Sequence, residues 1–223
     1  MIVLITGSSS GIGLELARIF LNKGFEVIGV SRREVSLGER YTHIVADLSR
    51  FEGIIKVREA LGEKKIDIMI NNAGFGIVKP LLQHTWDEIE EIFRVNTISP
   101  VVLTKELLGN LKKGSTVVFV ISGAAFVKTL DMPAYGASKS ALHYLATILS
   151  SELKERGIKV LRVYPKQVNT DFWKGNAPRG SLDPKDVAMR IVRAIEEGKE
   201  EVFIPWYIGL SKHFPIKYRL YQD

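Results

Sequence analysis

Short apolar runs alternate with amphipathic stretches along the whole chain, and this alternation limits the possible folds more than any other feature. The apolar runs hold too few polar residues to leave one face in water, so each predicts a strand that is buried on both faces. Such strands, separated by helices, form a parallel sheet with helices on both sides. The predicted strands span residues 2–5, 25–30, 43–46, 66–70, 116–121, 159–163 and 202–204.

The stretches between the strands have the period of helices that bury one side. We expect helices over residues 11–22, about 50–61, 86 to about 111 and about 134–156, and a last one that opens at Asp183-Pro184. Pro100 is expected to kink the long third helix, because proline has no N–H for the helical hydrogen bond. Asp183 and Pro184 are typical of an N-cap and a first helical position. The sequence therefore predicts one domain over residues 1–223, a doubly wound, Rossmann-like α/β sheet.

Composition and charge exclude several other classes of protein. The net charge is +6 and the pI is near 9.4, but the basic residues are scattered, so we expect a solvated basic surface and no nucleic-acid partner. The chain has no cysteine, and its four histidines are scattered, so we expect neither a disulfide nor a metal site. The first residues do not resemble a secretory signal, and no apolar run is long enough to span a bilayer. We expect a cytoplasmic protein without contact to a membrane surface.

The turn after the first predicted strand is rich in glycine and serine. It reads Gly7-Ser8-Ser9-Ser10-Gly11-Ile12-Gly13 and leads directly into the first helix. Glycines at this place let backbone N–H groups approach a phosphate, and the helix offers its positive end to it. The spacing alone is a weak signal, and a turn that only packs is the alternative. The position after strand one favours a dinucleotide site that includes Gly7, Ser9, Ser10, Gly11, Ile12 and Gly13.

Ser31-Arg32-Arg33 follows the second strand. A site for NAD usually has an acid here, which accepts hydrogen bonds from the ribose 2′-OH and repels a 2′-phosphate. Two guanidinium groups in place of the acid favour NADP over NAD, because guanidinium binds phosphate in a bidentate way. A solvated basic turn is the alternative interpretation.

The next two strand ends carry weaker signals. Asp47 can accept a hydrogen bond from an adenine amino group and Leu48 can lie on the ring, although Asp47 could equally cap a turn. Asn71, Ala73 and Gly74 belong to the Asn71-Asn72-Ala73-Gly74 segment, which places amides and small residues beside the expected cofactor. Ordinary turn chemistry would explain the same residues.

Tyr135 and Lys139 are four residues apart on a predicted helix and therefore face the same way. A fixed ammonium group favours phenolate and is expected to lower the pKa of the tyrosine, which suits a general acid or base. Ser122 ends the fifth strand, so its hydroxyl can hold a substrate oxygen beside the phenol. Alone, a Tyr-x-x-x-Lys spacing is common on solvated helices.

Taken together, these motifs resemble the short-chain dehydrogenase/reductase family, in its compact one-domain branch, over nearly the full length. The residues that carry the resemblance are Thr6-Gly7-x-x-x-Gly11-Ile12-Gly13, Asp47, Asn71-Asn72-Ala73-Gly74, Asn96, Ser122, Tyr135-x-x-x-Lys139 and Pro165-x-x-Val168-x-Thr170. The resemblance implies hydride transfer between a nicotinamide dinucleotide and a small carbonyl or alcohol substrate, with Tyr135 as acid/base, and the two arginines make NADP(H) the expected dinucleotide.

The resemblance also implies roles for the other residues. Lys139 lowers the pKa of Tyr135 and binds the nicotinamide ribose, and Ser122 holds the carbonyl. Asn96 anchors a water that links Lys139 to solvent. Pro165 belongs to the same motif as Val168 and Thr170, which hold the nicotinamide carboxamide. Relatives pair their long helices as homodimers or homotetramers, and the helix with Tyr135 carries a surplus of apolar residues here, namely Leu142, Leu145, Ala146, Leu149 and Leu153. Burial of both stripes inside one subunit is the alternative.

Two features depart from the family pattern, and one segment is left open. Lys166 stands where the family usually has glycine, and the segment 171–182 is short for a substrate lid, so Phe172 and Trp173 either cover the site or belong to the core. The tail, residues 206–223, has three possible roles: packing on its own domain, which is the default, contact with another subunit, or contact with a membrane. A non-catalytic dinucleotide sensor and a nucleotide-sugar epimerase or dehydratase are the competing functions; the intact Ser122, Tyr135 and Lys139 set argues against the first, and the missing substrate domain against the second.

Overall fold

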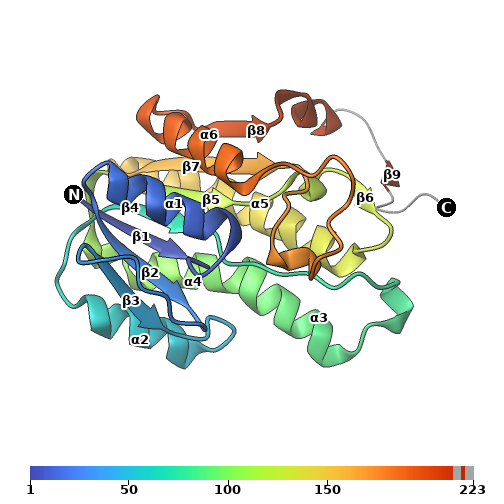
Figure 1. The fold of residues 1–223 in the computed structure, drawn as a ribbon, viewed down its shortest axis with the longest axis horizontal. Helices are drawn as coiled ribbons and strands as arrows, with labels where there is room; N and C mark the ends of the chain where they lie inside the picture. Colours follow the sequence, from blue (N-terminus) through green and yellow to red (C-terminus); the bar gives the residue numbers. More distant parts are fainter. Residues whose placement is uncertain (213–216, 219–223) are drawn as a thin grey trace.

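A computed structural model describes residues 1–212, 217 and 218, and its centre is a parallel sheet of seven strands (Figure 1). The strand order is β3-β2-β1-β4-β5-β7-β8, so the chain starts in the middle of the sheet and winds first to one edge and then to the other. This is the predicted doubly wound, Rossmann-like architecture. The strands are β1 (Ile2–Thr6), β2 (Glu26–Ser31), β3 (Tyr41–Val45), β4 (Ile66–Asn71), β5 (Leu111–Val120), β7 (Lys159–Pro165) and β8 (Glu201–Ile204).

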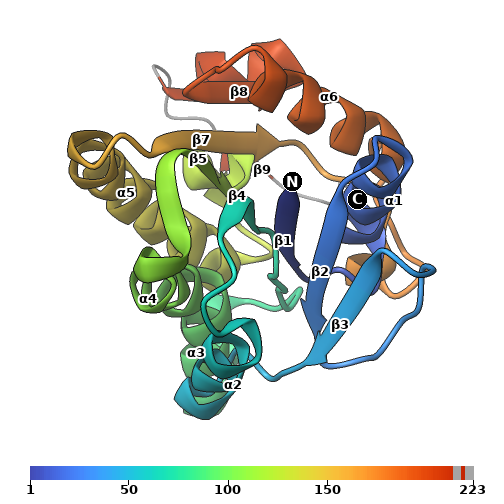
Figure 2. The ribbon, with the colours of Figure 1, turned by 90° about the vertical axis from the view of Figure 1, so that its left-hand side faces the viewer.

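Helices cover both faces of the sheet (Figure 2). One face carries α1 (Gly11–Asn22) and α6 (Pro184–Glu196), which also contact each other. The opposite face carries α2 (Phe51–Leu61), α3 (Trp86–Phe93), α4 (Ser99–Glu106) and α5 (Pro133–Glu155). Two apolar cores result, because successive strand residues point to opposite faces: Leu4 belongs to one core, and Val3 and Ile5 to the other.

The predicted helix over residues 86–111 is wrong in detail. The chain forms α3, one π turn over Arg94–Ile98, α4, and a short 3-10 turn over Leu108–Asn110. The backbone stays helical from Trp86 to Glu106, so the change is a π turn within the predicted helix and not an end of it. Pro100 explains the irregular turn, since it has no N–H to donate to the carbonyl of Asn96 four residues earlier. Strand β5 then begins at Leu111 rather than at residue 116, and β3 begins at Tyr41 rather than at residue 43.

Elsewhere the predicted elements agree with the structure to within about two residues. Asp183 is the N-cap of α6, and its carboxylate accepts hydrogen bonds from the backbone N–H groups of Lys185 and Asp186. A small second sheet was not predicted: β6 (Lys128–Thr129) pairs in parallel with β9 (Lys217–Tyr218).

Candidate active site

One cavity of about 810 Å³ lies at the carboxyl ends of the strands, where ligands bind in sheets of this type. Loops after β1, β2, β3, β4, β5 and β7 line it, together with α5 and the C-terminal segment. Most of the predicted site residues meet there. They are Gly7, Ser9, Ser10, Gly11, Ile12, Arg32, Arg33, Asp47, Leu48, Ala73, Gly74, Ser122, Tyr135, Lys139, Pro165, Val168 and Thr170. Gly13, Asn71 and Asn96 do not line the cavity.

The glycine-rich turn has the conformation that its sequence requires. Gly7 and Gly11 have φ angles of +69° and +54°, a region that side chains rarely adopt. A Cβ on Gly7 would also lie 2.9 Å from the amide nitrogen of Asn72. The start of α1 has no side-chain cap and no acid in its first turn, so its N–H groups are available to an anion. This geometry fits the pyrophosphate of a dinucleotide.

Gly13 has a packing role instead of a binding role. A Cβ there would overlap with the backbone oxygen of Gly7, so only glycine lets α1 pack this closely on the turn. Asn71 is turned away from the cavity, and its buried amide nitrogen donates to Thr104 of α4 at 3.1 Å. Its neighbour Asn72 lines the cavity and donates from Nδ2 to the Thr6 carbonyl at 3.0 Å. Asn72, and not the predicted Asn71, is therefore the amide that lies beside the cavity, and it also supports the glycine-rich turn.

Two arginines lie at the far end of the cavity, after β2. Arg33 donates to the Ser9 carbonyl at 3.1 Å and lies 3.4 Å from Asp171 across the cavity mouth. Arg32 lies 3.9 Å from Glu91. Both side chains are mostly exposed, so these surface pairs are weak and can be exchanged for a phosphate. Asp47 also lines the cavity, and one of its oxygens accepts from the N–H and hydroxyl of Ser49, at 3.0 and 2.8 Å.

Ser122, Tyr135 and Lys139 converge at the other end. The Ser122 hydroxyl is hydrogen-bonded to the Tyr135 phenol and accepts from the N–H of Ala124 at 3.1 Å. Lys139 follows one helical turn after Tyr135, and its Nζ lies 5.8 Å from the centre of the tyrosine ring. The same Nζ donates to the Val120 carbonyl at 3.1 Å.

The expected lowering of the tyrosine pKa is wrong for this structure. Burial raises the pKa of Tyr135 to about 12, although the hydrogen bond from Ser122 opposes the shift. Burial also lowers the pKa of Lys139 to about 8. Desolvation disfavours the charged form of each group and is the largest cause of both shifts. At neutral pH the phenol keeps its proton and the lysine is still mostly charged.

Asn96 lies in the π turn, next to the end of the Lys139 side chain. Its amide nitrogen donates to the Phe75 carbonyl at 2.8 Å and to the Ser138 hydroxyl at 3.0 Å, while its side-chain oxygen accepts from the Phe75 N–H at 3.0 Å. A Cβ on Gly74 would lie 3.1 Å from Asn96 Oδ1 and 3.2 Å from Lys139 Nζ. Asn96 therefore holds the loop after β4 against the end of Lys139.

The segment after β7 closes one wall. Thr170 packs on Gly11, where a Cβ would lie 2.8 Å from its methyl carbon, so the segment after β7 contacts the glycine-rich turn here. The Val168 carbonyl accepts a hydrogen bond from the Trp173 indole at 2.9 Å. Lys166 lines the cavity, and its backbone N–H donates to the Ile204 carbonyl at 2.7 Å, which keeps this edge in the sheet.

Phe172 and Trp173 form part of the cavity wall, which favours their covering role. They lie in a short 3-10 turn, η5 (Asp171–Trp173). The Phe172 ring lies edge-on to Tyr135 with centroids 5.4 Å apart. Met132 lies beside both rings, because a Cβ on Gly76 would contact all three side chains. The substrate end of the cavity is therefore largely apolar.

The C-terminal segment contributes residues that the sequence did not reveal as site residues. It forms the turn η6 (Trp206–Lys212), from which Tyr207, Ile208 and Ser211 line the cavity. A Cβ on Gly123 would lie 2.6 Å from Ile208, so this segment packs directly on the residue after Ser122. The described part of the tail thus packs on its own domain; residues 213–216 and 219–223 lie outside the described residues.

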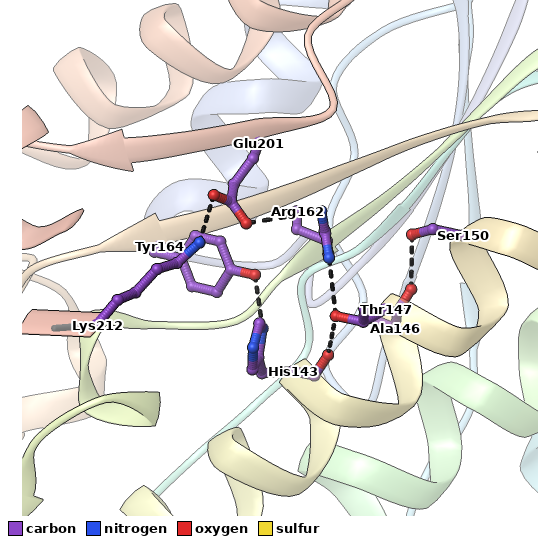
Figure 3. Close-up of polar contacts among 8 residues, drawn as sticks. All are labelled: His143, Ala146, Thr147, Ser150, Arg162, Tyr164, Glu201 and Lys212. Carbon is purple, nitrogen blue, oxygen red and sulfur yellow. Dashed lines mark hydrogen bonds and ion pairs between the residues drawn. The ribbon is translucent and has the colours of Figure 1, made fainter.

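Lys212 anchors this segment in a polar cluster behind the cavity (Figure 3). Its ammonium pairs with Glu201 of β8 and lies 4.7 Å from the centre of the Phe203 ring. Tyr164 of β7 stacks on Phe203 with centroids 4.6 Å apart and is hydrogen-bonded to His143 of α5 at 2.8 Å. The cluster connects β7, β8, α5 and the tail.

A doubly wound sheet with a glycine-rich turn and one long cleft at its carboxyl edge defines a dinucleotide-binding protein. The family model for short chain dehydrogenases matches residues 1–179. The chain is 32% identical to serine 3-dehydrogenase from Agrobacterium fabrum, over 96% of this chain and 90% of that protein. It is 28% identical to NADPH-dependent 3-dehydrocapnine reductase from Ornithobacterium rhinotracheale, over 87% and 76% of the two chains.

A solved structure shows the same likeness. The short-chain dehydrogenase from Sphingobium yanoikuyae, in complex with NADPH, has a TM-score of 0.81 at 25% identity and covers 91% of this chain and 87% of its own. The chain belongs to the short-chain dehydrogenase family, whose members are oxidoreductases. Within residues 1–212, 217 and 218, no group of His, Asp and Glu could hold a metal ion, and no helix is long and apolar enough to cross a membrane.

Proposed function

We propose that this protein transfers a hydride between NADP(H) and a carbonyl or secondary alcohol, with Tyr135 as acid/base. The observation that carries the proposal is the meeting of Ser122, Tyr135 and Lys139 in the same cavity as the glycine-rich turn. A sensor that only binds a dinucleotide has no use for this set. The apolar wall of Met132, Phe172 and Ile208 favours a small substrate with an apolar part.

Each residue of the chain has a distinct task in this proposal. A bound nicotinamide supplies the hydride chemistry. Ser122 holds the substrate oxygen next to the phenol, and Tyr135 gives its proton to that oxygen in reduction or takes one in oxidation. Lys139 keeps a positive charge beside the phenol as it loses its proton. Asn96 is proposed to anchor a water for Lys139, and its carbonyl is left without the usual helical donor by Pro100.

The preference for NADP over NAD rests on the loop after β2. Arg32 and Arg33 line the cavity there, and no acid follows β2 at the usual place. A guanidinium attracts a 2′-phosphate, whereas the carboxylate of NAD-binding relatives repels it. Val168 and Thr170 at the other end are proposed to hold the carboxamide.

We also propose a cytoplasmic homodimer or homotetramer. Tyr144, Leu145 and Ile148 of α5 are 68%, 38% and 47% exposed, whereas Leu142, Ala146 and Leu153 of the same helix are buried. Of the five apolar residues that the sequence singled out, only Leu145 is exposed, and Leu149 packs half-buried against the core, so most of that surplus is buried inside the subunit. The apolar face left to solvent is a different one, made by Tyr144, Leu145 and Ile148. A second copy would cover it.

Substitution of the tyrosine tests the proposed chemistry. Tyr135→Phe removes the proton donor and keeps the ring beside Phe172, so kcat for a panel of ketones and aldehydes should fall by about 10²–10⁴-fold. The dissociation constant for NADPH should change little, which shows that the fold is intact. Near-normal turnover in this variant would exclude the mechanism.

A further inference from the structure

A chain of hydrogen bonds runs under the predicted 2′-phosphate end of the cleft. Ser8 Oγ lies 3.0 Å from Tyr41 Oη, and Tyr41 Oη lies 2.8 Å from His43 Nδ1. His43 Nε2 lies 3.1 Å from Ser31 Oγ, which in turn lies 2.7 Å from the Arg33 carbonyl. Since Arg33 also donates to the Ser9 carbonyl, the chain closes on the glycine-rich turn where it began.

The direction of each bond follows from the chemistry of its partners. A carbonyl only accepts, so the single Ser31 hydroxyl proton goes to Arg33, and Ser31 must accept from His43 Nε2. Burial lowers the pKa of His43, so the ring is neutral at pH 7 and has one N–H only. Nδ1 therefore accepts from Tyr41, and Tyr41 accepts from Ser8. Each hydroxyl proton and the one ring N–H of this chain is thus donated to one acceptor.

The backbone makes room for this chain at one place. Tyr41 of β3 reaches across β2 to Ser8, and the residue it crosses is Gly29. A Cβ on Gly29 would overlap with Tyr41 Oη and with Ser8 Oγ, so a larger residue would separate the two hydroxyls. Ser8 and Tyr41 are both buried, so neither has water as an alternative partner.

The loss of a hydrogen bond at one end of this chain changes the hydrogen bonds at the other end. Without the Tyr41 hydroxyl, the His43 ring can take its second neutral tautomer, in which Nδ1 carries the proton and Nε2 accepts a hydrogen bond instead of donating one. The Ser31 hydroxyl then turns to His43 and leaves the Arg33 carbonyl. The turn of residues 31–33, which presents both arginines to the cleft, loses the hydrogen bond that fixes its shape.

We propose that Tyr41 and His43 are positioning residues that hold the Arg32-Arg33 turn for a 2′-phosphate and so set the preference for NADPH over NADH. This inference rests on the proposed cofactor choice. Neither residue lines the cavity, so their effect on the cofactor passes through Ser31 and the arginine turn.

The test compares dissociation constants for NADPH and NADH, measured by fluorescence titration of the whole protein. Tyr41→Phe should weaken NADPH binding about fivefold, the factor of one neutral hydrogen bond, and leave NADH within about twofold. Tyr164→Phe is the matched control: it also removes a buried tyrosine hydroxyl 2.8 Å from a histidine Nδ1, but in the cluster behind the cavity (Figure 3). The control should leave the ratio of the two constants unchanged.

Two further variants keep the test decisive if Tyr41→Phe unfolds. His43→Leu should reduce the preference for NADPH in the same way, and His43→Gln should restore most of it, because an amide again offers one donor and one acceptor. If the ratio of the NADPH and NADH dissociation constants is unchanged in folded Tyr41→Phe or His43→Leu, or if both cofactors bind equally more weakly, this inference is overturned. The proposed cofactor choice would then still stand. Tighter binding of NADH by the unmodified protein would overturn the proposed cofactor choice as well.

Discussion

The buried ammonium of Lys139 has a measurable cost that depends on pH. Its pKa falls from 10.5 to about 8 because burial disfavours the charged form, and the side chain is only 3% exposed. At pH 7 the lysine is charged in both the folded and the unfolded chain. Lowering its pKa from 10.5 to about 8 therefore costs the folded state about 3 kcal/mol. Above the folded pKa, the native lysine loses its proton and the cost declines. By pH 10 less than about 1 kcal/mol remains.

Lys139→Met removes this charge with little change in volume. Because methionine does not titrate, the stability of the unmodified protein should rise relative to the variant by about 2.5 kcal/mol between pH 7 and pH 10. In a domain of this size that corresponds to a relative shift in melting temperature of roughly 5–10 °C. The variant also loses the hydrogen bond to Val120. That loss lowers the stability of the variant at both pH values and does not affect the pH dependence of the difference. Oxidation of NADPH by the variant should be strongly impaired at both pH values.

Urea unfolding at pH 7 and pH 10 measures the difference directly. Lys154→Met on the same helix is the control, since that side chain is 81% exposed and its removal should give no pH-dependent difference. If the stability difference between Lys139→Met and the unmodified protein were the same at both pH values, Lys139 would have an ordinary pKa and the reasoning from burial would be refuted.

Three other substitutions test separate parts of the proposal. Arg32→Ala should weaken NADPH binding by about 1.5–3 kcal/mol and spare NADH, as measured by titration; equal losses would contradict a 2′-phosphate contact. Ile148→Lys places a charge on the exposed face of α5 and should shift the protein to smaller species in light scattering, whereas an unmodified protein that already has the 25.0 kDa monomer mass would exclude the interface. Lys212→Met should raise KM for a carbonyl substrate about fivefold and leave NADPH binding unchanged, because it loosens the segment that carries Ile208; unchanged KM would show that the anchor does not shape the pocket.

The sheet could be predicted because its signal is local. The inner strands are apolar on both faces, and this pattern can be read from a few consecutive residues without knowing what packs on them. The edge strand β3 differs, since it leaves residues of both faces exposed, at Thr42 and Val45. The π turn between α3 and α4 could not be predicted from such a local pattern. Pro100 indicated a disturbance, but whether a proline kinks a helix, ends it or is preceded by a π turn depends on what packs around it.

Within the site, the residue types were predictable and their orientations less so. Asn71 and Asn72 are adjacent and chemically identical, yet Asn71 is the last residue of β4 and points to Thr104, while Asn72 turns back to the glycine-rich loop. One residue at a strand end decides which face a side chain takes. Tyr207 and Ile208 were missed because they reach the cavity from the far end of the chain, after β8, and no short motif marks them.

The pKa values of Tyr135 and Lys139 show why sequence spacing alone predicts the wrong direction of a pKa shift. Spacing on a helix indicates that the two groups are close, and closeness alone predicts a lowered pKa for the phenol. The structure adds that Lys139 is buried and Tyr135 half-buried, and removal from water shifts each pKa in favour of the neutral form of the group. At neutral pH the outcome is a phenol with its proton and an ammonium with its charge. In the proposed function, this is the state from which Tyr135 gives its proton to a substrate oxygen, while the Lys139 ammonium stabilises the phenolate that remains. Because burial lowers the pKa of Lys139 to about 8, the same proposal predicts that proton transfer becomes less favourable as the pH rises past that value and the ammonium loses its charge.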